Sequence, residues 1–357
     1  MLNKQKPKIG FYSPYLSIFG GGERYLLSIA KSLSDDFEVS LFGPIEIKKE
    51  AERLFGLDLE KIKFSNDQQF LRKSFIKKTL DLTAYNKFFY MTDGSLFFSP
   101  LKENFLIIQS PAHIPKLNLL NRIKLRDWKI LCYSRFMADI IFLKLERQAY
   151  ILPPPIDIPA FGKKEKKENL ILTVGRFFPY PHNKKQDMLL AIFKKYYQKV
   201  FKDWHFVIAG GLNEEGGRKI VEELQKESKG YPVEVQVNLP FSKLCRLYAK
   251  AKIYWHGAGF EEDLVRYPER AEHFGITTLE AMTAACVPVV FAGGGQTEIV
   301  KNGENGFLWR NEKELVEKTE KLMDSNYFTR ISRQAQKRAT DYSFKNFNEK
   351  LEKIIYG

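Results

Sequence analysis

Two glutamates, Glu272 and Glu280, stand eight positions apart in the segment EHFGITTLEAM, which covers residues 272–282. Carboxylates hydrogen-bond vicinal hydroxyl groups well, so this spacing favours a hydroxylated ligand. The competing interpretation is structural, because Thr277-x-x-Glu280 is a capping-box pattern in which both side chains satisfy free amides at a helix start. The two interpretations are compatible, since Glu280 can help to begin a helix and also meet a ligand. Glu272 lies outside the capping box.

The backbone between these glutamates is a candidate anion site. Glu272 precedes the predicted helix and Glu280 lies in its first turn, so both carboxylates can face a molecule whose phosphates bind the amides around Gly275 and Ile276. A ligand with phosphates in its middle and hydroxyl groups at both ends is a nucleotide-sugar. The segment therefore points to a site for such a molecule, with Glu272 and Glu280 at its two ends.

Three cations lie in the segment VGRFFPYPHNKKQD, namely Arg176, Lys184 and Lys185. We predict this segment to be the loop between a strand and a helix. Arg176 directly follows a glycine at a strand end, which is the edge of the sheet where open α/β folds bind ligands. A cationic clamp on a diphosphate would be mounted there. The alternative is a solvated basic loop.

Three glycine clusters follow apolar strands or their loops, and the first and third lead into predicted helices. Glycine at such places lets the backbone approach a phosphate. None of the clusters spells the dinucleotide fingerprint, because GGGERY and GGGQTE lack its final glycine. A nicotinamide-binding domain is therefore weakly supported, and a tight turn is the alternative for each cluster. The clusters are Gly20–Gly22, Gly210–Gly211 and Gly293–Gly295.

Short apolar runs alternate with amphipathic helical stretches along the chain, which is typical of parallel sheets covered by helices. The pattern occurs twice. The predicted strands are KIGFYSP, FEVSLFG, NFLIIQS and KILCYS in the first half, and NLILTVG, WHFVIAGG, AKIYWHG and VPVVFAGG in the second. Between the halves, YILPPPIDIPAFGKKEKKEN has three consecutive prolines and a charged run, which predicts an exposed hinge.

Three helical segments can be placed on a helical wheel. In residues 189–200 the apolar side chains share one face, and in the C-terminal segment after Ser343, a plausible N-cap, they form one stripe. In residues 70–78, by contrast, charged and apolar side chains interleave, so this is not a clean membrane-surface helix. The two apolar faces consist of Leu189, Ile192, Phe193, Tyr196, Tyr197 and Val200, and of Phe344, Phe347, Leu351, Ile354 and Ile355.

Length and composition indicate the number of domains, the kind of partner and the cellular compartment. A chain of 357 residues exceeds one comfortable core, so two domains are expected. The net charge of +14 favours an anionic partner such as nucleic acid, a phosphorylated ligand or an acidic membrane, unless the proteome is generally Lys-rich. Cys132, Cys245 and Cys286 fit neither a disulfide framework nor a zinc pair, which favours a reducing cytoplasm. No apolar run approaches the ~20 residues of a membrane-spanning helix, so membrane contact is expected to be peripheral.

Together, several motifs resemble the retaining glycosyltransferases of family 4, also called glycosyl transferases group 1. They are GGGERYLLSIAKSL, VGRFF, HNKKQD, YWHGAGF, PERAEHFGITTLEAMTAACVPVVFAGGGQTEIV and NGENGFLW. The resemblance covers nearly the whole chain and is most specific over residues 174–309. It implies an α/β chain of GT-B fold, with two Rossmann-like domains that face each other across a cleft. The implied parts are an acceptor-binding domain (1–157), a nucleotide-sugar-binding domain (158–341) and a C-terminal helix (342–357) that crosses back to the first domain.

The resemblance also implies roles for individual residues. Glu272 would hold the transferred sugar and Glu280 the ribose. Arg176 and Lys184 would neutralise the leaving diphosphate, with Lys185 as the alternative because this loop is longer than the usual pattern. Similar enzymes typically need no metal, because these cations and a helix N-terminus stabilise the leaving charge. The other implied donor-binding positions are Gly21, Gly22, His256, Gly275, Ile276 and Thr277, although an isolated histidine such as His256 is more often structural.

One position departs from the family pattern. Many family members carry a histidine after the strand that corresponds to NFLIIQS, whereas this chain has Gln109 there and His113 four residues later. Gln109 can hydrogen-bond a hydroxyl group but cannot act as a base. In the family, retention of configuration is usually attributed to front-face attack assisted by the leaving phosphate, so activity does not require that histidine. Gln109 and His113 are both candidates for contact with the donor sugar.

The implied function is metal-independent transfer of a hexose, with retention, from a GDP- or UDP-linked donor to a glycan or lipid-linked acceptor. We expect no cofactor besides this donor, no nucleic-acid partner, and a cytoplasmic protein that is peripheral on an anionic inner membrane face. Two alternatives stay open. A GT-B epimerase would convert the donor without an acceptor, and a catalytically silent binding protein is suggested by Gln109. The insert EEDLVRYPER could gate the site or be a solvated loop.

Overall fold

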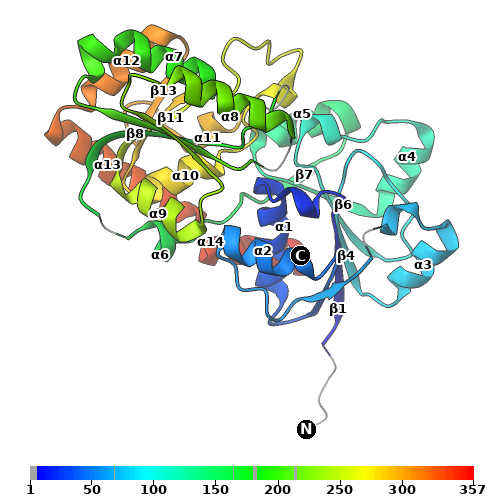
Figure 1. Cartoon of the computed structure of the whole chain (residues 1–357). Coiled ribbons are helices and arrows are strands. Elements are labelled where there is room, and N and C mark those ends of the chain that lie inside the picture. Colours follow the sequence, from blue (N-terminus) through cyan, green and yellow to red (C-terminus); the bar gives the residue numbers. More distant parts are fainter. Residues whose placement is uncertain (1–5, 68, 164, 180–182, 213–214) are drawn as a thin grey trace. The chain divides into compact units, whose positions relative to one another are not determined.

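The computed structural model describes residues 6–67, 69–163, 165–179, 183–212 and 215–357. By its internal contacts the chain divides into two compact units (Figure 1). The N-terminal unit consists of Met1–Pro154 together with Phe347–Gly357, and the C-terminal unit consists of Pro155–Asn346. The N-terminal unit is therefore built from two separate stretches of sequence. The expected domain ranges of 1–157, 158–341 and 342–357 remain predictions.

The N-terminal unit contains a sheet of seven parallel strands in the order β3-β2-β1-β4-β5-β6-β7. Aromatic side chains on neighbouring strands stack across it: the ring of Phe89 lies 4.7 Å from that of Phe11 and 4.4 Å from that of Phe105. Such cross-strand pairs hold adjacent strands in register. The strands are β1 (Lys8–Tyr12), β2 (Glu38–Phe42), β3 (Lys63–Ser65), β4 (Lys87–Met91), β5 (Glu103–Ile107), β6 (Trp128–Cys132) and β7 (Ala149–Ile151).

Five α-helices of the N-terminal unit connect these strands. Their bounds are α1 (Gly21–Leu33), α2 (Glu46–Phe55), α3 (Phe75–Thr83), α4 (Leu119–Lys124) and α5 (Arg135–Leu145). The last helix of the chain, α14 (Phe344–Tyr356), begins in the C-terminal unit and packs on the N-terminal one. Ser343 Oγ accepts a hydrogen bond from Asn346 N at 3.4 Å, so the predicted N-cap is confirmed. The predicted stripe is buried at Phe347, Leu351, Ile354 and Ile355 and partly buried at Phe344.

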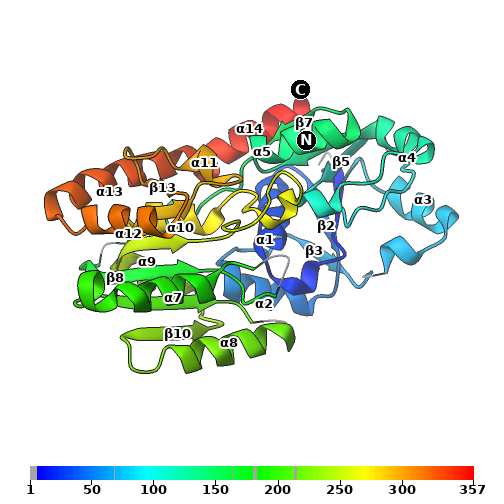
Figure 2. The same ribbon diagram turned by 90° about the horizontal axis from the view of Figure 1, so that it is seen from above.

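The C-terminal unit contains a sheet of six parallel strands in the order β10-β9-β8-β11-β12-β13. Helices cover both faces, with α7 and α8 on one face and α9 and α10 on the other (Figures 1 and 2). The strands are β8 (Glu168–Val174), β9 (His205–Gly210), β10 (Val233–Val237), β11 (Ala251–His256), β12 (Val287–Phe291) and β13 (Phe307–Trp309). The helices are α6 (Ile158–Phe161), α7 (Gln186–Tyr196), α8 (Glu215–Glu227), α9 (Phe241–Lys250), α10 (Ile276–Thr283), α11 (Gln296–Ile299), α12 (Glu312–Lys321) and α13 (Ser325–Ala339).

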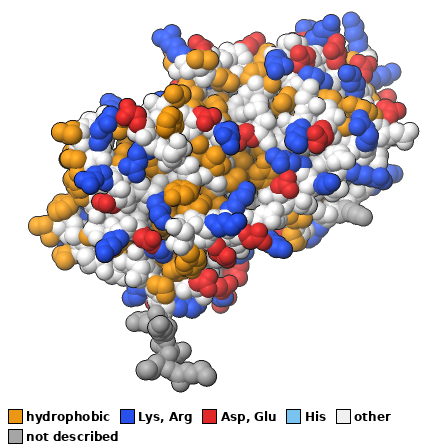
Figure 3. Space-filling model, turned by 180° about the vertical axis from the view of Figure 1, so that it is seen from behind, with side chains coloured by type: hydrophobic (Ala, Val, Ile, Leu, Met, Phe, Trp, Pro, Cys, Tyr) orange, Lys and Arg blue, Asp and Glu red, His pale blue; other side chains and the backbone are white. Residues whose placement is uncertain are grey.

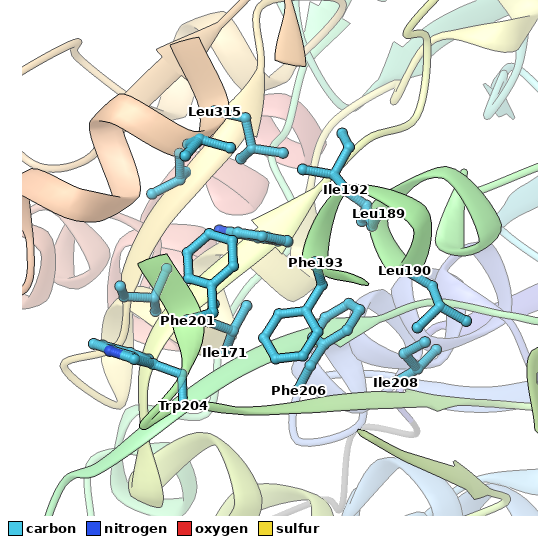
Figure 4. Packing of buried hydrophobic residues seen from close by; sticks show 14 of the residues in the cluster. Ile171, Leu189, Leu190, Ile192, Phe193, Phe201, Trp204, Phe206, Ile208 and Leu315 are labelled. Atoms are coloured by element: carbon cyan, nitrogen blue, oxygen red, sulfur yellow. The ribbon is translucent and has the colours of Figure 1, made fainter. Parts of the chain in front are cut away.

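Helix α7 buries the apolar face that the helical period predicts. Leu189, Ile192 and Phe193 are fully or almost fully buried, and Phe193 packs on Phe206 of β9 and on Phe201 (Figure 4). A π-helical turn over Tyr197–Phe201 continues the helix and brings Phe201 into the same cluster. The predicted core-facing helix with a solvated basic side is therefore confirmed.

The strand order of both sheets reverses at their first strand. In the N-terminal unit β1 pairs with β2 and β4, and in the C-terminal unit β8 pairs with β9 and β11. Because the strands are parallel, β8 and β11 end at the same edge of the sheet. From there the chain continues to β9 on one side and to β12 on the other, so the loops after β8 and β11 lead in opposite directions. Open α/β sheets bind ligands at such a switch point, beyond the carboxyl ends of the strands.

The predicted α/β class and all eight predicted strands are confirmed. The two units divide within the predicted hinge, between Pro154 and Pro155, but its proline-rich part is buried and not exposed. Leu152 N donates to Cys132 O at 2.9 Å and so continues the pairing of β7 with β6 beyond Ile151. Leu152 and Ile156 are fully buried, and Ile156 N donates to Tyr342 O at 2.8 Å. The prolines prevent helix formation here, yet extended backbone with buried side chains accommodates them.

No helix among the described residues is both long and apolar enough to cross a bilayer.

Candidate active site

The candidate site of the C-terminal unit is built at the switch point between β8 and β11. Gly175 follows β8, and the side chain of Lys184, from the loop before α7, lies across it. A Cβ atom at Gly175 would be only 2.8 Å from Lys184 Cγ, so this glycine leaves the space in which the lysine lies. His256 is the last residue of β11. The two neighbouring strands therefore bring a cation and an imidazole to the same edge of the sheet.

Glu272 joins these two side chains. Its Oε2 accepts a hydrogen bond from Lys184 Nζ at 2.8 Å and lies 3.0 Å from Nε2 of the buried His256. Burial by itself would raise the pKa of the Glu272 carboxyl, but the charge of Lys184 and the hydrogen bond with His256 outweigh it and hold that pKa well below its usual range. Glu272 is therefore a carboxylate at neutral pH, paired with a cation.

Lys185 belongs to a different ion-pair network. Its Nζ lies 2.7 Å from Glu262 Oε1, and the other oxygen of Glu262 accepts a hydrogen bond from Arg270 Nη1 at 2.8 Å. The Arg270 guanidinium lies 3.8 Å from the ring centre of Tyr267. These residues belong to the insert EEDLVRYPER, so part of the insert is fixed to the cationic loop. Whether it gates the site stays a hypothesis.

Arg176 is the third predicted cation. Its guanidinium lies over the ring of Phe178, 5.4 Å from the ring centre, and no carboxylate of the described residues forms an ion pair with it. Phe177 N donates to Gly211 O at 2.9 Å, which holds the backbone beside Arg176 against the end of β9. Of the three cations, Arg176 is thus the one whose charge no described carboxylate balances.

Helix α10 starts at Ile276, with Gly275 as its N-cap at φ 114°. Glycine tolerates this left-handed backbone, whereas other residues rarely adopt it. The side chain of Gln296 lies over Gly275, and a Cβ atom there would be 2.8 Å from Gln296 Oε1. The Gln296 amide is fully buried and has no hydrogen-bond partner among the described residues. A buried amide without a partner stands at the helix end where we expect phosphate.

The predicted capping box is wrong. Thr277 and Glu280 are the second and fifth residues of α10, and no side chain caps its first turn. The Thr277 hydroxyl accepts a hydrogen bond from Tyr254 Oη at 2.7 Å, and Glu280 Oε2 accepts one from Tyr248 Oη at 2.9 Å. Both tyrosines lie on neighbouring elements, so these polar groups connect α10 to β11 and α9. Glu280 is only 3 % exposed, and its contact with a ribose stays a prediction.

The third glycine cluster supports the backbone of Glu272. Gly295 N donates to Glu272 O at 2.8 Å, and a Cβ atom at Gly294 would come within 2.1 Å of the same oxygen. Gly210 similarly leaves space for Gly175 O, 2.0 Å from where its Cβ atom would be. These glycines allow two backbone segments to approach each other, which is the tight-turn alternative for both clusters.

The remaining predicted residues lie in the N-terminal unit. Gly21 is the first residue of α1, after the N-cap Gly20. Gln109 follows β5 and lies against Gly22, where a Cβ atom would be 1.9 Å from Gln109 Oε1. His113 is not part of this pair, since its ring stacks on that of Tyr15 at 5.2 Å. Burial lowers the pKa of His113 in spite of the nearby charge of Asp93.

Several residues at the site were not predicted from the sequence. Glu262 and Arg270 were seen only as charges of the insert, although an acid and a base eight positions apart in a loop are a signal for an internal ion pair. Gln296 stands directly after the third glycine cluster, a place where a side chain can reach back over the helix start. Nothing in the sequence indicated the partners of Glu280 and Thr277.

Within the described residues, no group of three or more His, Cys, Asp or Glu side chains could hold a metal ion.

Comparison with known proteins gives three kinds of match. The family model described as "Glycosyl transferases group 1" matches residues 156–341. The chain is 26% identical over 223 residues to a GDP-Man:Man(3)GlcNAc(2)-PP-Dol alpha-1,2-mannosyltransferase of Dictyostelium discoideum, which covers 58% of this chain and 42% of the relative. It is 27% identical over 232 residues to the Caenorhabditis elegans protein of the same name, with 58% and 47% covered. The match thus spans less than half the length of these relatives.

Solved structures match over almost the whole chain. Anabaena HepE in complex with UDP has a TM-score of 0.72 at 17% identity, with 99% of this chain and 100% of that chain covered. A glycosyltransferase from Rickettsia africae has a TM-score of 0.74 at 15% identity, with 98% and 99% covered. Likeness at such low identity concerns the fold, and both domains of the fold are included.

Proposed function

Since the chain belongs to the glycosyl transferases group 1 family and has the GT-B fold, we propose that it is a retaining, metal-independent hexosyltransferase. Its donor would be a nucleoside-diphosphate sugar and its acceptor a hydroxyl group of a glycan or a lipid-linked glycan. The Lys184–Glu272–His256 cluster at the switch point of the C-terminal sheet carries this proposal. It combines a cation for a diphosphate with a carboxylate for sugar hydroxyl groups.

Donor binding would exchange the partner of Lys184. In the structure Lys184 is paired with Glu272. A diphosphate oxygen would replace the carboxylate as its partner, and Glu272 would then be free to accept hydrogen bonds from hydroxyl groups of the sugar. Arg176, which no described carboxylate neutralises, would supply a second positive charge. The amides at the start of α10 and the buried amide of Gln296 would complete the phosphate site.

The chemical step then follows from this charge distribution. The bond between the anomeric carbon and the phosphate oxygen breaks, and the acceptor oxygen bonds to the same face of the sugar. The acceptor proton passes to the leaving phosphate. Lys184 and Arg176 stabilise the negative charge that develops on the diphosphate, which is the contribution a metal ion makes in other transferases. Excess EDTA should therefore leave the transfer rate unchanged.

GDP-mannose is the first donor to test. The relatives from Dictyostelium discoideum and Caenorhabditis elegans are named as enzymes that use GDP-Man and a PP-Dol-linked acceptor. UDP-glucose is the comparison donor. Binding of the correct nucleotide to the folded protein raises its thermal midpoint, so a panel of nucleoside diphosphates and their sugars identifies the base before any acceptor is known.

Two substitutions test the partner exchange. Lys184→Ala should weaken binding of the free nucleoside diphosphate at least tenfold, because a charge-assisted contact contributes about 1.5–3 kcal/mol. Glu272→Gln should instead bind the free diphosphate as tightly as the wild type or more tightly, because the carboxylate no longer competes for Lys184. Its transfer rate should nevertheless fall at least a hundredfold. Isothermal titration measures the first quantity and product formation the second.

Lys194→Ala is the matched control, because it breaks an ion pair with Glu227 of α8 near the C-terminal end of α7. It should change neither quantity. Weaker diphosphate binding by Glu272→Gln would contradict the exchange. Conversion of the donor without any acceptor would favour the epimerase, and donor binding without transfer or hydrolysis across a panel of acceptors would favour the silent binding protein.

A further inference from the structure

Helices α3 and α4 of the N-terminal unit present large apolar side chains to solvent. On α3, Phe75, Ile76 and Leu80 are 61%, 68% and 65% exposed. At 100° per residue, Ile76 and Leu80 lie about 40° apart on α3. The buried Leu82 and Lys78, whose Nζ lies over the ring of Phe97, lie on the opposite side of the helix. Ile76 and Leu80 therefore lie on the solvent-facing side of α3, and Phe75 is exposed in its first turn. The interleaving expected for residues 70–78 does not apply, because the helix begins only at Phe75 and Phe70 is buried in a preceding 3₁₀ turn.

Helix α4 has no buried residue at all. Leu119, Leu120 and Ile123 are 77%, 52% and 46% exposed. A helix whose apolar side chains are not covered by its own unit gains no stability from them in water. We call the six exposed apolar residues of α3 and α4 the apolar patch.

The two helices are linked through Phe98. The ring of Phe75 lies 6.4 Å from that of Phe98, and Lys124 Nζ, at the end of α4, lies 5.6 Å from the centre of the same Phe98 ring. Phe98 is itself 39% exposed. Figure 3 shows apolar side chains interspersed with Lys and Arg at its left edge, where α3 and α4 lie in that view. Phe98 therefore lies between the exposed Phe75 of α3 and the end of α4.

Positive charge surrounds the apolar patch. Residues 70–83 carry four cations, Arg72, Lys73, Lys77 and Lys78, and one acid, Asp81. Residues 114–127 carry four cations, Lys116, Arg122, Lys124 and Arg126, and one acid, Asp127. Some of these cations have partners, such as Lys73 with Asp81 and Arg122 with Glu146. Lys77, Lys116 and Arg126 are exposed. A surface with apolar side chains at its centre and cations around them matches the boundary between acyl chains and anionic headgroups.

We propose that α3 and α4 form a docking surface for an anionic lipid bilayer. The apolar patch enters the acyl boundary, and the surrounding lysines and arginines contact the lipid phosphates. Nucleic acid does not explain exposed leucine and isoleucine side chains. A second copy of the chain is disfavoured, because the cations of the two patches would repel each other. This inference concerns attachment, and it holds whether or not the donor chemistry proposed above is correct.

Vesicle sedimentation with the full chain tests the docking surface. Wild-type protein should sediment with vesicles of phosphatidylcholine and phosphatidylglycerol, and much less with phosphatidylcholine alone. The double substitution Ile76→Ser/Leu119→Ser should lower the partition coefficient at least tenfold. Both side chains are exposed, so its thermal midpoint should stay that of the wild type. Raising the salt concentration should weaken the wild-type binding, because salt screens the contacts with headgroups.

Val265→Ser is the matched control, because Val265 is 97% exposed but lies in the other unit. Its partition should equal that of the wild type. The proposal is overturned if the wild type does not sediment with anionic vesicles, or if the double variant sediments equally well. A wild-type dimer that becomes monomeric in the double variant, without vesicle binding in either, would assign the apolar patch to a second copy instead.

Discussion

Lys184 and Lys185 are neighbours in sequence, yet their side chains reach different carboxylates. Lys184 pairs with Glu272 and Lys185 with Glu262. The sequence offered both as candidates for the diphosphate, because two adjacent lysines in one loop look alike. The backbone separates them, since Lys185 has φ 58° and directs its side chain away from that of Lys184. Only the structure reveals that Lys185 is tied to the insert.

Another lysine, Lys167, is partly buried in the C-terminal unit. Its Nζ donates to the carbonyl oxygens of Tyr248, Ala251 and Ala284 at 3.3, 2.7 and 2.6 Å. Helix ends leave carbonyl groups without partners, and the ammonium group has one N–H for each of these three. Burial lowers the pKa of Lys167 to about 8. The charged form of this lysine is therefore costly even though its donors are satisfied.

Stability should consequently depend on pH through Lys167. Between pH 8 and the ordinary lysine value near 10.5, the unfolded chain keeps a proton that the folded chain has released, so the free energy of unfolding rises with pH. From pH 7 to about 9.5, the wild type should gain about 2 kcal/mol relative to Lys167→Met. Urea unfolding of both proteins at each pH measures this difference. Parallel pH profiles would contradict the prediction.

At the residue scale, the sequence predicted which residues belong to the site better than it predicted which side chains they contact. Glu272, Lys184 and His256 were all candidate residues, and the structure joins them in one cluster. The pairing of Glu280 with Tyr248 could not be foreseen, because it depends on how α9 packs beside α10. The capping box failed because the helix begins at Ile276, with Gly275, two residues before Thr277, at the N-cap position.

At the scale of elements, the insert and the start of α7 form one unit of structure. Lys185 occupies the N-cap of α7 with a left-handed backbone, which disfavours any residue except glycine by about 1 kcal/mol. Its ion pair with Glu262 fixes the insert to the helix start. The strain at Lys185 is therefore accompanied by an interaction that a glycine could not make.

Lys185→Gly should separate these two effects. The glycine relieves the backbone strain but removes the anchor of the insert, so the overall stability should stay within about 1 kcal/mol of the wild type. Hydrogen exchange of residues 261–270 should nevertheless become faster, as it should in Glu262→Gln, which keeps the lysine. Lys194→Ala should leave that exchange unchanged. An insert that stays equally protected in both variants would show that its other contacts suffice.

Eight strands were predicted from the sequence and five were not. The eight predicted strands are long apolar runs, while three of the five that were not predicted, β3, β7 and β13, have only three residues each. Strand β10 lies at an edge and alternates with polar residues. The fifth, β4, is the continuous run KFFYM in the middle of its sheet. A short apolar run without alternation cannot be distinguished from a helix by its period.

At the scale of the whole molecule, the N-terminal unit depends on residues from the far end of the chain. Phe347 packs against the ring of Tyr25 at 6.3 Å, and Lys87 Nζ donates to Ile355 O at 3.3 Å. Four side chains of α14 are buried. Each contributes about 1.5–3 kcal/mol, and their sum is comparable with the total stability of a domain, about 5–15 kcal/mol.

Deletion of residues 347–357 should therefore unfold or strongly destabilise the N-terminal unit while the C-terminal unit stays folded. Hydrogen exchange should show loss of protection in β1 and β4, with β8 and β11 protected as in the wild type. Tyr356→Ser is the control, because Tyr356 is 64% exposed, and it should change little. If β1 and β4 of the deletion variant stay protected, the helix is not needed by the sheet.

This division of the N-terminal unit also determines when it can be completed during synthesis. The ribosome makes residues 1–154 first, then the entire C-terminal unit, and only then residues 347–357. At about 5–20 residues per second, the N-terminal sheet waits roughly 10–40 s for its last helix. During this interval the surface that α14 will cover, including Tyr25 and Phe37, stays open. Most of the N-terminal unit is thus translated before the C-terminal unit but completes its fold after it, so it is the unit that a chaperone would need to protect.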